Sequence, residues 1–177
     1  QETCNNHMAS AFGFADRIAG LRQLATRCPY MDLDRVGIVS SLGISDSIYG
    51  LLEYPDFYKV GVVHDLEDTR LMPSSWEELF KAPNQESSSK VIYAEHQVAS
   101  LQGKLLLIHG MLDPEPPVTT TLRLIAALQK ENKDFDLLLL PNLGHEKSDY
   151  VIRQTWDYLV THLQNIEPPQ GFRLSAT

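Results

Sequence analysis

Leu105-Leu106-Leu107-Ile108-His109-Gly110-Met111-Leu112-Asp113 is the stretch that decides the fold of this chain. It is a short apolar run that ends abruptly in a polar tip, a pattern typical of a buried strand. A second run of this kind, from Phe135 to Leu140, is followed by Pro141-Asn142-Leu143-Gly144-His145. Because helical periodicity lies between the two runs, they are expected to be parallel neighbours with both tips at one edge of a sheet.

The rest of the chain continues this alternation of strands and helices. Strands are expected at 35–39 and 58–63. An amphipathic helix is expected at roughly 14–27. Helical segments are expected after the turn at 40–47 up to about Leu52, around Trp76 to Phe80 and near 92–99. Apolar faces of two later helices are expected along Val118, Leu122, Ile125 and Leu128, and along Ile152, Trp156, Leu159 and Leu163. The strands are continuous apolar runs, as in parallel sheets that are covered on both faces. The sequence therefore predicts an α/β fold of the α/β-hydrolase type, with a doubly wound, mostly parallel sheet and helices on both faces.

Size and charge narrow the function classes. The chain has 177 residues, of which 43% are hydrophobic, so we expect one globular domain over 1–177. A formal net charge of −8 disfavours nucleic acid or an anionic membrane as the main partner. The two cysteines, Cys4 and Cys28, have neither a disulfide framework nor metal-ligand spacing, so cysteine usage does not indicate a compartment.

The two polar tips offer a carboxylate and an imidazole, which are two members of a nucleophilic triad. Asp113 follows one strand and His145 follows the other. In hydrolases of this architecture the order along the chain is Ser, Asp, His, and the serine occupies a G-x-S-x-G turn between a strand and a helix. Taken alone, Asp113 is better explained as a turn or helix-capping residue, and His145 as a solvated loop residue.

The place for the serine is the segment Val39-Ser40-Ser41-Leu42-Gly43. Ser41 and Gly43 satisfy the second half of the pattern, whereas the β-branched Val39 replaces its first glycine. The alternative is a polar strand-to-helix loop in which Ser45 or Asp46 caps the next helix.

Two other histidines are interpreted structurally. His109 is expected to be a hydrogen-bonded residue at the end of the sheet rather than a base. His64, with Asp65 and Asp68, lacks the spacing of a metal site and is expected in a surface loop. The sequence therefore predicts no metal and no cofactor.

Three segments resemble the prolyl oligopeptidase family (peptidase S9), specifically its dipeptidyl-peptidase IV-like bacterial members. Residues 34–38 with 54–62 resemble the nucleophile region, 103–113 the aspartate segment, and 132–145 the histidine segment; Pro168-Pro169 also fits. The resemblance begins at about Phe14 and implies a serine peptidase with Asp113 as the acid and His145 as the base.

At the nucleophile the chain departs from the family pattern. An ungapped match puts Leu42 at the serine position, whereas a one-residue deletion within the turn puts Ser41 there. With Ser41 as nucleophile, the backbone N–H of Leu42 would serve as an oxyanion donor. The resemblance implies peptide substrates, and small esters are expected to be better substrates because the family's β-propeller is not part of this chain.

The family pattern also includes earlier hydrolase strands, which supply a second oxyanion donor and the residues that bind a peptide's N-terminus. The sequence is thus interpreted as the C-terminal portion of such a domain, and an open sheet edge predicts a homo-oligomer or a complementing chain. The family resemblance alone implies a secreted or periplasmic protein. Two hypotheses remain as alternatives to an active serine hydrolase: the chain is a degenerate hydrolase fold kept as a binding module, or it is one piece of a split protease.

Overall fold

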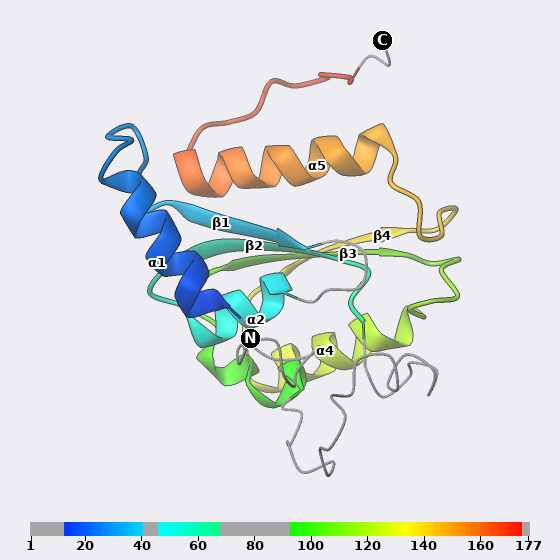
Figure 1. Cartoon of the computed structure of the whole chain (residues 1–177). Helices are drawn as coiled ribbons and strands as arrows, with labels where there is room; N and C mark the ends of the chain where they lie inside the picture. Colours follow the sequence, from blue (N-terminus) through cyan, green and yellow to red (C-terminus); the bar gives the residue numbers. More distant parts are fainter. Residues whose placement is uncertain (1–12, 41–45, 68–92, 175–177) are drawn as a thin grey trace, which may run out of the picture.

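The sheet has four parallel strands that lie side by side in sequence order (Figure 1). A computed structural model describes residues 13–40, 46–67 and 93–174. Within them the strands are β1 (Val36–Ser40), β2 (Tyr58–His64), β3 (Lys104–Gly110) and β4 (Asp136–Leu140). Parallel neighbours need long crossover connections, which are usually helical, and this sheet confirms the α/β fold expected from the alternating pattern.

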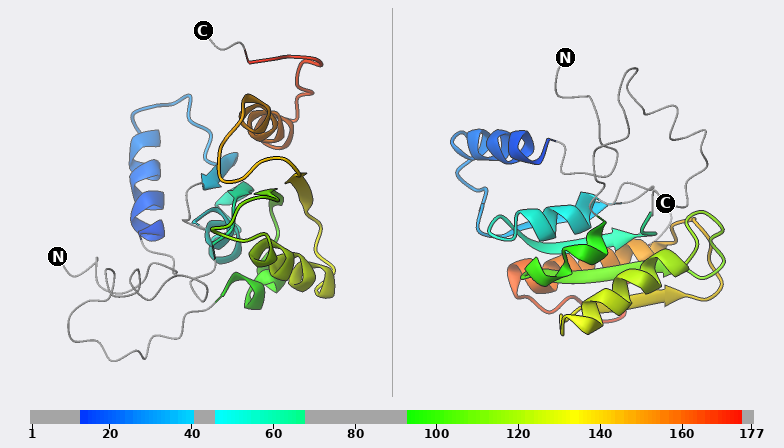
Figure 2. Two further views of the ribbon diagram at one scale, coloured as in Figure 1. Left: turned by 90° about the vertical axis from the view of Figure 1, so that its right-hand side faces the viewer. Right: turned by 90° about the horizontal axis from the view of Figure 1, so that it is seen from below.

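Helices lie on both faces of the sheet. They are α1 (Phe14–Ala25), α2 (Asp46–Glu53), α4 (Thr119–Lys130) and α5 (Asp149–Leu159), which continues as a π-helical turn over Val160–Gln164. Helices α2 and α4 lie on one face and α5 on the other (Figures 1 and 2). The helix expected near 92–99 is, within the described residues, two 3₁₀ turns, Ala94–His96 and Val98–Ser100. None of the described helices has the length and hydropathy that a membrane span requires.

Two hydrophobic clusters match the two faces. The larger includes Val63, Leu105 and Leu107 of the sheet and side chains of α1, α2 and α4. The smaller joins Val62, Leu106 and Ile108 to Val151 of α5. Successive residues of β2 and β3 point to opposite faces, so an uninterrupted apolar run contributes to both clusters.

The outer strands are less buried than the continuous apolar runs predicted. Val39 in β1 and Leu137 in β4 are 44% and 41% exposed, whereas Val60, Val62 and Leu105 are fully buried. β1 and β4 each have one strand neighbour in the described sheet, so helices cover the two central strands more completely.

The face of the last helix differs from the expected one. Trp156 is 54% exposed, while Val151 and Thr155 are buried. The expected apolar face was wrong at Trp156, because α5 faces the sheet with Val151 and Thr155, and Thr155 makes a polar contact with β2 that is described below. The helix expected around Trp76 to Phe80 lies outside the described residues.

Candidate active site

The carboxyl ends of β3 and β4 are joined by backbone hydrogen bonds beyond the sheet. Gly110 is paired with Leu140 in the sheet register. Met111 then donates its N–H to the carbonyl of Leu140 at 3.0 Å, and Leu112 donates to Leu143 at 3.0 Å. The loops that follow the two strands are thereby fixed against each other.

Gly110 is required at this junction by the close approach of the second loop. A Cβ at this position would lie 2.1 Å from the carbonyl oxygen of Gly144 and 2.7 Å from that of Leu143. Both atoms belong to backbone, so they could not move away as a flexible side chain could. The absence of a side chain at Gly110 lets the His145 loop lie directly against the end of β3.

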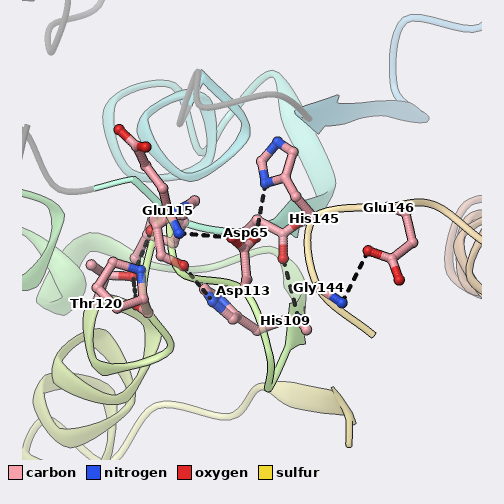
Figure 3. A network of polar contacts seen from close by, with 12 residues as sticks. Asp65, His109, Asp113, Glu115, Thr120, Gly144, His145 and Glu146 are labelled. Atoms are coloured by element: carbon pink, nitrogen blue, oxygen red, sulfur yellow. Dashed lines mark hydrogen bonds and ion pairs between the residues drawn. The ribbon is translucent and has the colours of Figure 1, made fainter. Parts of the chain in front are cut away.

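Asp113 and His145 meet across these two loops (Figure 3). His145 Nδ1 lies 2.8 Å from Asp113 Oδ2, and the Asp113 side chain has no exposed surface while that of His145 is 39% exposed. The other carboxylate oxygen, Oδ1, accepts the backbone N–H of Glu115 at 2.8 Å. Because an ionised carboxylate only accepts, His145 donates from Nδ1, which leaves Nε2 as the ring's proton acceptor when the imidazole is neutral.

The surrounding charges raise the pKa of His145 above its usual value. The largest cause is the hydrogen bond to Asp113, and the negative charges of Asp113, Asp65 and Glu67 act in the same direction. Burial opposes them because it disfavours the charged imidazolium. Burial also raises the pKa of Glu67 to about 7, so this carboxyl titrates in the range in which a histidine does.

Asp65, the first residue after β2, belongs to the same cluster. Asp65, His109 and Asp113 each offer a possible ligand atom within 4.8 Å of the others, so these described side chains must be tested as a cation site. Pro116 O can only accept, so His109 donates Nε2–H to it at 3.1 Å, and Nδ1 accepts from the hydroxyl of Thr121 at 2.8 Å. His109 has no free lone pair in this arrangement, so the three residues do not fit a metal site. As expected, His109 is a buried, hydrogen-bonded histidine.

The prediction that His64 lies in a surface loop was wrong. His64 is the last residue of β2, is 6% exposed and lies with its Nε2 3.0 Å from the hydroxyl oxygen of Thr155 in α5. That hydroxyl donates to the carbonyl of Val151, so His64 donates Nε2–H to Thr155. Burial, together with the charge of Lys147, lowers the pKa of His64 to about 4. The imidazole is therefore a neutral link between the sheet and α5.

Sequence reasoning did not assign Asp65 to this site. The signal was present, because Asp65 follows an apolar strand in the same way as Asp113 does. The prediction of a surface loop for His64, Asp65 and Asp68 is wrong for Asp65 as well, because Asp65 is buried at the end of β2. The parallel register, in which His64 pairs with Ile108, brings the end of β2 beside that of β3.

Ser41 and Leu42 lie outside the described residues. The residues on either side are described: Ser40 ends β1, and Asp46 begins α2. The hydroxyls of Ser40 and Ser47 are hydrogen-bonded to each other, and both serines are buried. This contact joins the carboxyl end of β1 to the first turn of α2 across the Ser41 segment.

A family model and two curated proteins match most of this chain. A model of the Prolyl oligopeptidase family matches residues 4–165. Dipeptidyl peptidase 8 of Homo sapiens is 26% identical over 169 residues, covering 91% of this chain and 18% of that protein, and the Mus musculus protein is 25% identical over 169 residues, covering 91% and 19%.

Solved structures show the same fold. The structure of Porphyromonas gingivalis dipeptidyl peptidase 4 has a TM-score of 0.73 at 23% identity, covering 86% of this chain and 23% of that one. Pyrococcus horikoshii acylaminoacyl peptidase has a TM-score of 0.65 at 16% identity, covering 91% and 29%. The chain spans about a fifth of the length of the curated relatives it matches.

Proposed function

Because the chain belongs to the prolyl oligopeptidase family, we propose that its sheet edge carries the acid and the base of a serine peptidase, which transfers the acyl group of a peptide or ester bond. The observation that supports this most directly is the 2.8 Å contact between His145 Nδ1 and the buried carboxylate of Asp113. A buried carboxylate in this position holds the imidazole in one tautomer and stabilises its protonated form.

The chemistry follows from that tautomer. His145 Nε2 takes the proton of a serine hydroxyl as the hydroxyl oxygen attacks the substrate carbonyl. The protonated imidazole then gives this proton to the leaving amine or alcohol, and an acyl-enzyme remains. Water, activated by the same nitrogen, hydrolyses the acyl-enzyme and restores the free serine.

We assign the nucleophile to Ser41 and one oxyanion donor to the backbone N–H of Leu42. The assignment rests on chain order and on the contact between Ser40 and Ser47, which joins the ends of the short segment that contains Ser41 at the carboxyl end of β1. This end adjoins that of β2, and through β2 that of β3, which precedes Asp113. A serine at this point follows the Ser, Asp, His order of α/β-hydrolases.

Peptides and small esters are the proposed substrates. The relatives are named dipeptidyl and acylaminoacyl peptidases, so their names indicate peptide bonds near a chain terminus. An ester requires less transition-state stabilisation than an amide. We therefore expect p-nitrophenyl acetate to be hydrolysed faster than a dipeptidyl p-nitroanilide.

Turnover of these two substrates by matched variants tests the proposal. Ser41→Ala and His145→Ala should abolish hydrolysis by the folded protein, whereas Ser100→Ala, a change at an exposed serine outside this segment, should retain it. If Ser41→Ala leaves the rate unchanged, the nucleophile assignment is wrong. A gain of activity in Leu42→Ser would instead place Leu42 at the serine position.

A binding module is the second candidate. It is favoured by Val39, which replaces the first glycine of the turn and is 44% exposed on the outer strand β1. We further propose that a second copy or a complementing chain covers this edge, as in a split protease, because β1 has one strand neighbour in the described sheet and a free strand edge can pair with another strand. Sedimentation at high protein concentration tests this: a stable monomer contradicts self-association.

A further inference from the structure

We propose that Asp65 is a positioning residue of this site: its carboxylate holds the turn that carries Asp113 and adds a second negative charge beside the Asp113–His145 pair. The role of His145 as a base rests on the proposed function, whereas the contacts of Asp65 do not. Figure 3 shows Asp65 beside Asp113, with its contact to the end of β3.

The first support is the contact between Asp65 and the turn. Asp65 Oδ1 accepts the backbone N–H of Gly110 at 3.3 Å, and the carbonyl of Gly110 accepts the N–H of Asp113 at 3.1 Å. The carboxylate of Asp65 thus binds Gly110, the residue whose carbonyl closes the turn that ends at Asp113. A loss of this contact would release the turn at its first residue.

The second support is the backbone of Asp65 itself. Its φ of 47° lies in the left-handed region, which is uncommon for residues other than glycine. The conformation is held on both sides: the N–H of Asp65 donates to Ile108 at 2.9 Å, and the carbonyl of Leu66 accepts from the hydroxyl of Thr120 at 2.6 Å. Such backbone conformations concentrate at functional sites because the surrounding structure must maintain them.

The third support is that the negative charge of Asp65 lies at a buried position. Asp65 is only 9% exposed and lies beside a second carboxyl group, so its negative charge is costly there. A neutral side chain could accept the Gly110 N–H without that cost. The nearby group that gains from the charge is His145, since the negative charge of Asp65 raises the pKa of His145. The pKa of Asp65 is itself raised above its usual value, chiefly by burial and also by the charge of Asp113, against the lowering effects of the Gly110 N–H, His109 and His145.

The test must distinguish the effect of Asp65 on the pKa of His145 from the effects of the other groups that act on this pKa. The groups that raise it are Asp113, Asp65 and Glu67, and Glu115 acts on Glu67 in turn. Glu67 is the complicating group because its pKa is about 7. We would therefore compare the variants both in the wild-type chain and in a Glu67→Gln background.

The experiment is an NMR titration of the His145 ring in the full chain, with the signal assigned by its loss in His145→Gln. Asp65→Asn keeps an oxygen for the Gly110 N–H but removes the charge, so it should shift the titration of His145 to lower pH in both backgrounds. Asp56→Asn is the matched control, because it removes the same charge from an exposed residue before the other end of β2 and should leave the titration unchanged. Asp65→Ala, which also removes the acceptor, should cause a larger shift.

A titration of His145 that is the same in Asp65→Asn and in the wild type would overturn the proposal. Should Asp65→Asn fail to fold, the carboxyl ¹³C shift of Asp65 in the wild type decides: an Asp65 that stays neutral while His145 titrates overturns it, and an ionised one supports it. These readouts need no turnover. A chain that hydrolyses nothing but shows the shift would contradict the proposed function and leave the role of Asp65 supported.

Discussion

Replacing Gly110 by alanine should separate the two loops that bring Asp113 and His145 together. The new Cβ would lie 2.1 Å from the carbonyl oxygen of Gly144 and 2.7 Å from that of Leu143, whereas ordinary contact needs at least 3.4 Å. The backbone of the His145 loop must therefore move by more than 1 Å. Overpacking of this kind costs about 1–3 kcal/mol of the free energy of unfolding, and a clash with backbone places Gly110→Ala at the upper end of that range.

The displacement should also be visible at the site. The Asp113–His145 contact of 2.8 Å should open, so the pKa of His145 should fall toward its usual value. Urea unfolding measures the stability loss, and an NMR titration of the His145 ring measures the pKa. The protein should lose hydrolytic activity even under conditions where it is fully folded.

Gly103→Ala is the matched control at the other end of β3. Its Cβ would lie 2.7 Å from the carbonyl oxygen of Lys59, another backbone atom, so it should destabilise the protein by a similar amount. It lies away from the two loops and should leave the titration of His145 unchanged. If Gly110→Ala leaves the pKa of His145 unchanged, or if Gly103→Ala shifts it equally, the reasoning about the loops is refuted.

Three further predictions concern single side chains. Burial lowers the pKa of His64 to about 4, so the folded state binds fewer protons than the unfolded state below pH 6.5. Stability should therefore fall as the pH falls from about 6.5 to about 4, by at most about 3 kcal/mol, and His64→Gln should remove this part of the pH dependence in urea titrations at each pH. Asp113→Asn removes the largest contribution that raises the pKa of His145, so the ring should titrate at lower pH and turnover should drop by about 10⁴-fold; an unchanged rate would exclude Asp113 as the acid. Gly20→Ala, in the middle of α1 with no atom near the added methyl, should raise the free energy of unfolding by about 0.5–1 kcal/mol, and a loss would mean that α1 is not helical there.

The sequence predicted the sheet because its signal is local. Each central strand is an apolar run that is buried on both faces, and each run is followed by a polar residue. The run at Leu105–Ile108 predicts a strand, and the helical periodicity between it and the next apolar run predicts that the two strands are parallel, with their polar tips at one edge. This explains why the α/β fold and the elements around both loops agree with the structure.

What the sequence could not reveal depends on contacts between segments. Helix α5 turns Val151 and Thr155 toward the sheet, where Thr155 is hydrogen-bonded to His64, and Trp156 faces outward although its spacing fits the apolar face. The membership of Asp65 in the site depends on the pairing of β2 with β3. Neither the contact between α5 and β2 nor the pairing of β2 with β3 can be predicted from the periodicity of one segment.

The glycines show the same limit. Gly110 and Gly144 look like ordinary turn residues in the sequence. In the structure the carbonyl of Gly144 occupies the place of a Cβ on Gly110. A pattern of single residues cannot indicate which two turns will be in contact.

The most direct test of the central claim is labelling of the folded chain with a fluorophosphonate probe, followed by mass spectrometry of the labelled peptide. The probe reacts only with a serine that a neighbouring base activates. We predict one adduct per chain at Ser41, which disappears in Ser41→Ala and in His145→Ala. A folded chain that takes up no probe, or that is labelled equally in His145→Ala, would contradict the account.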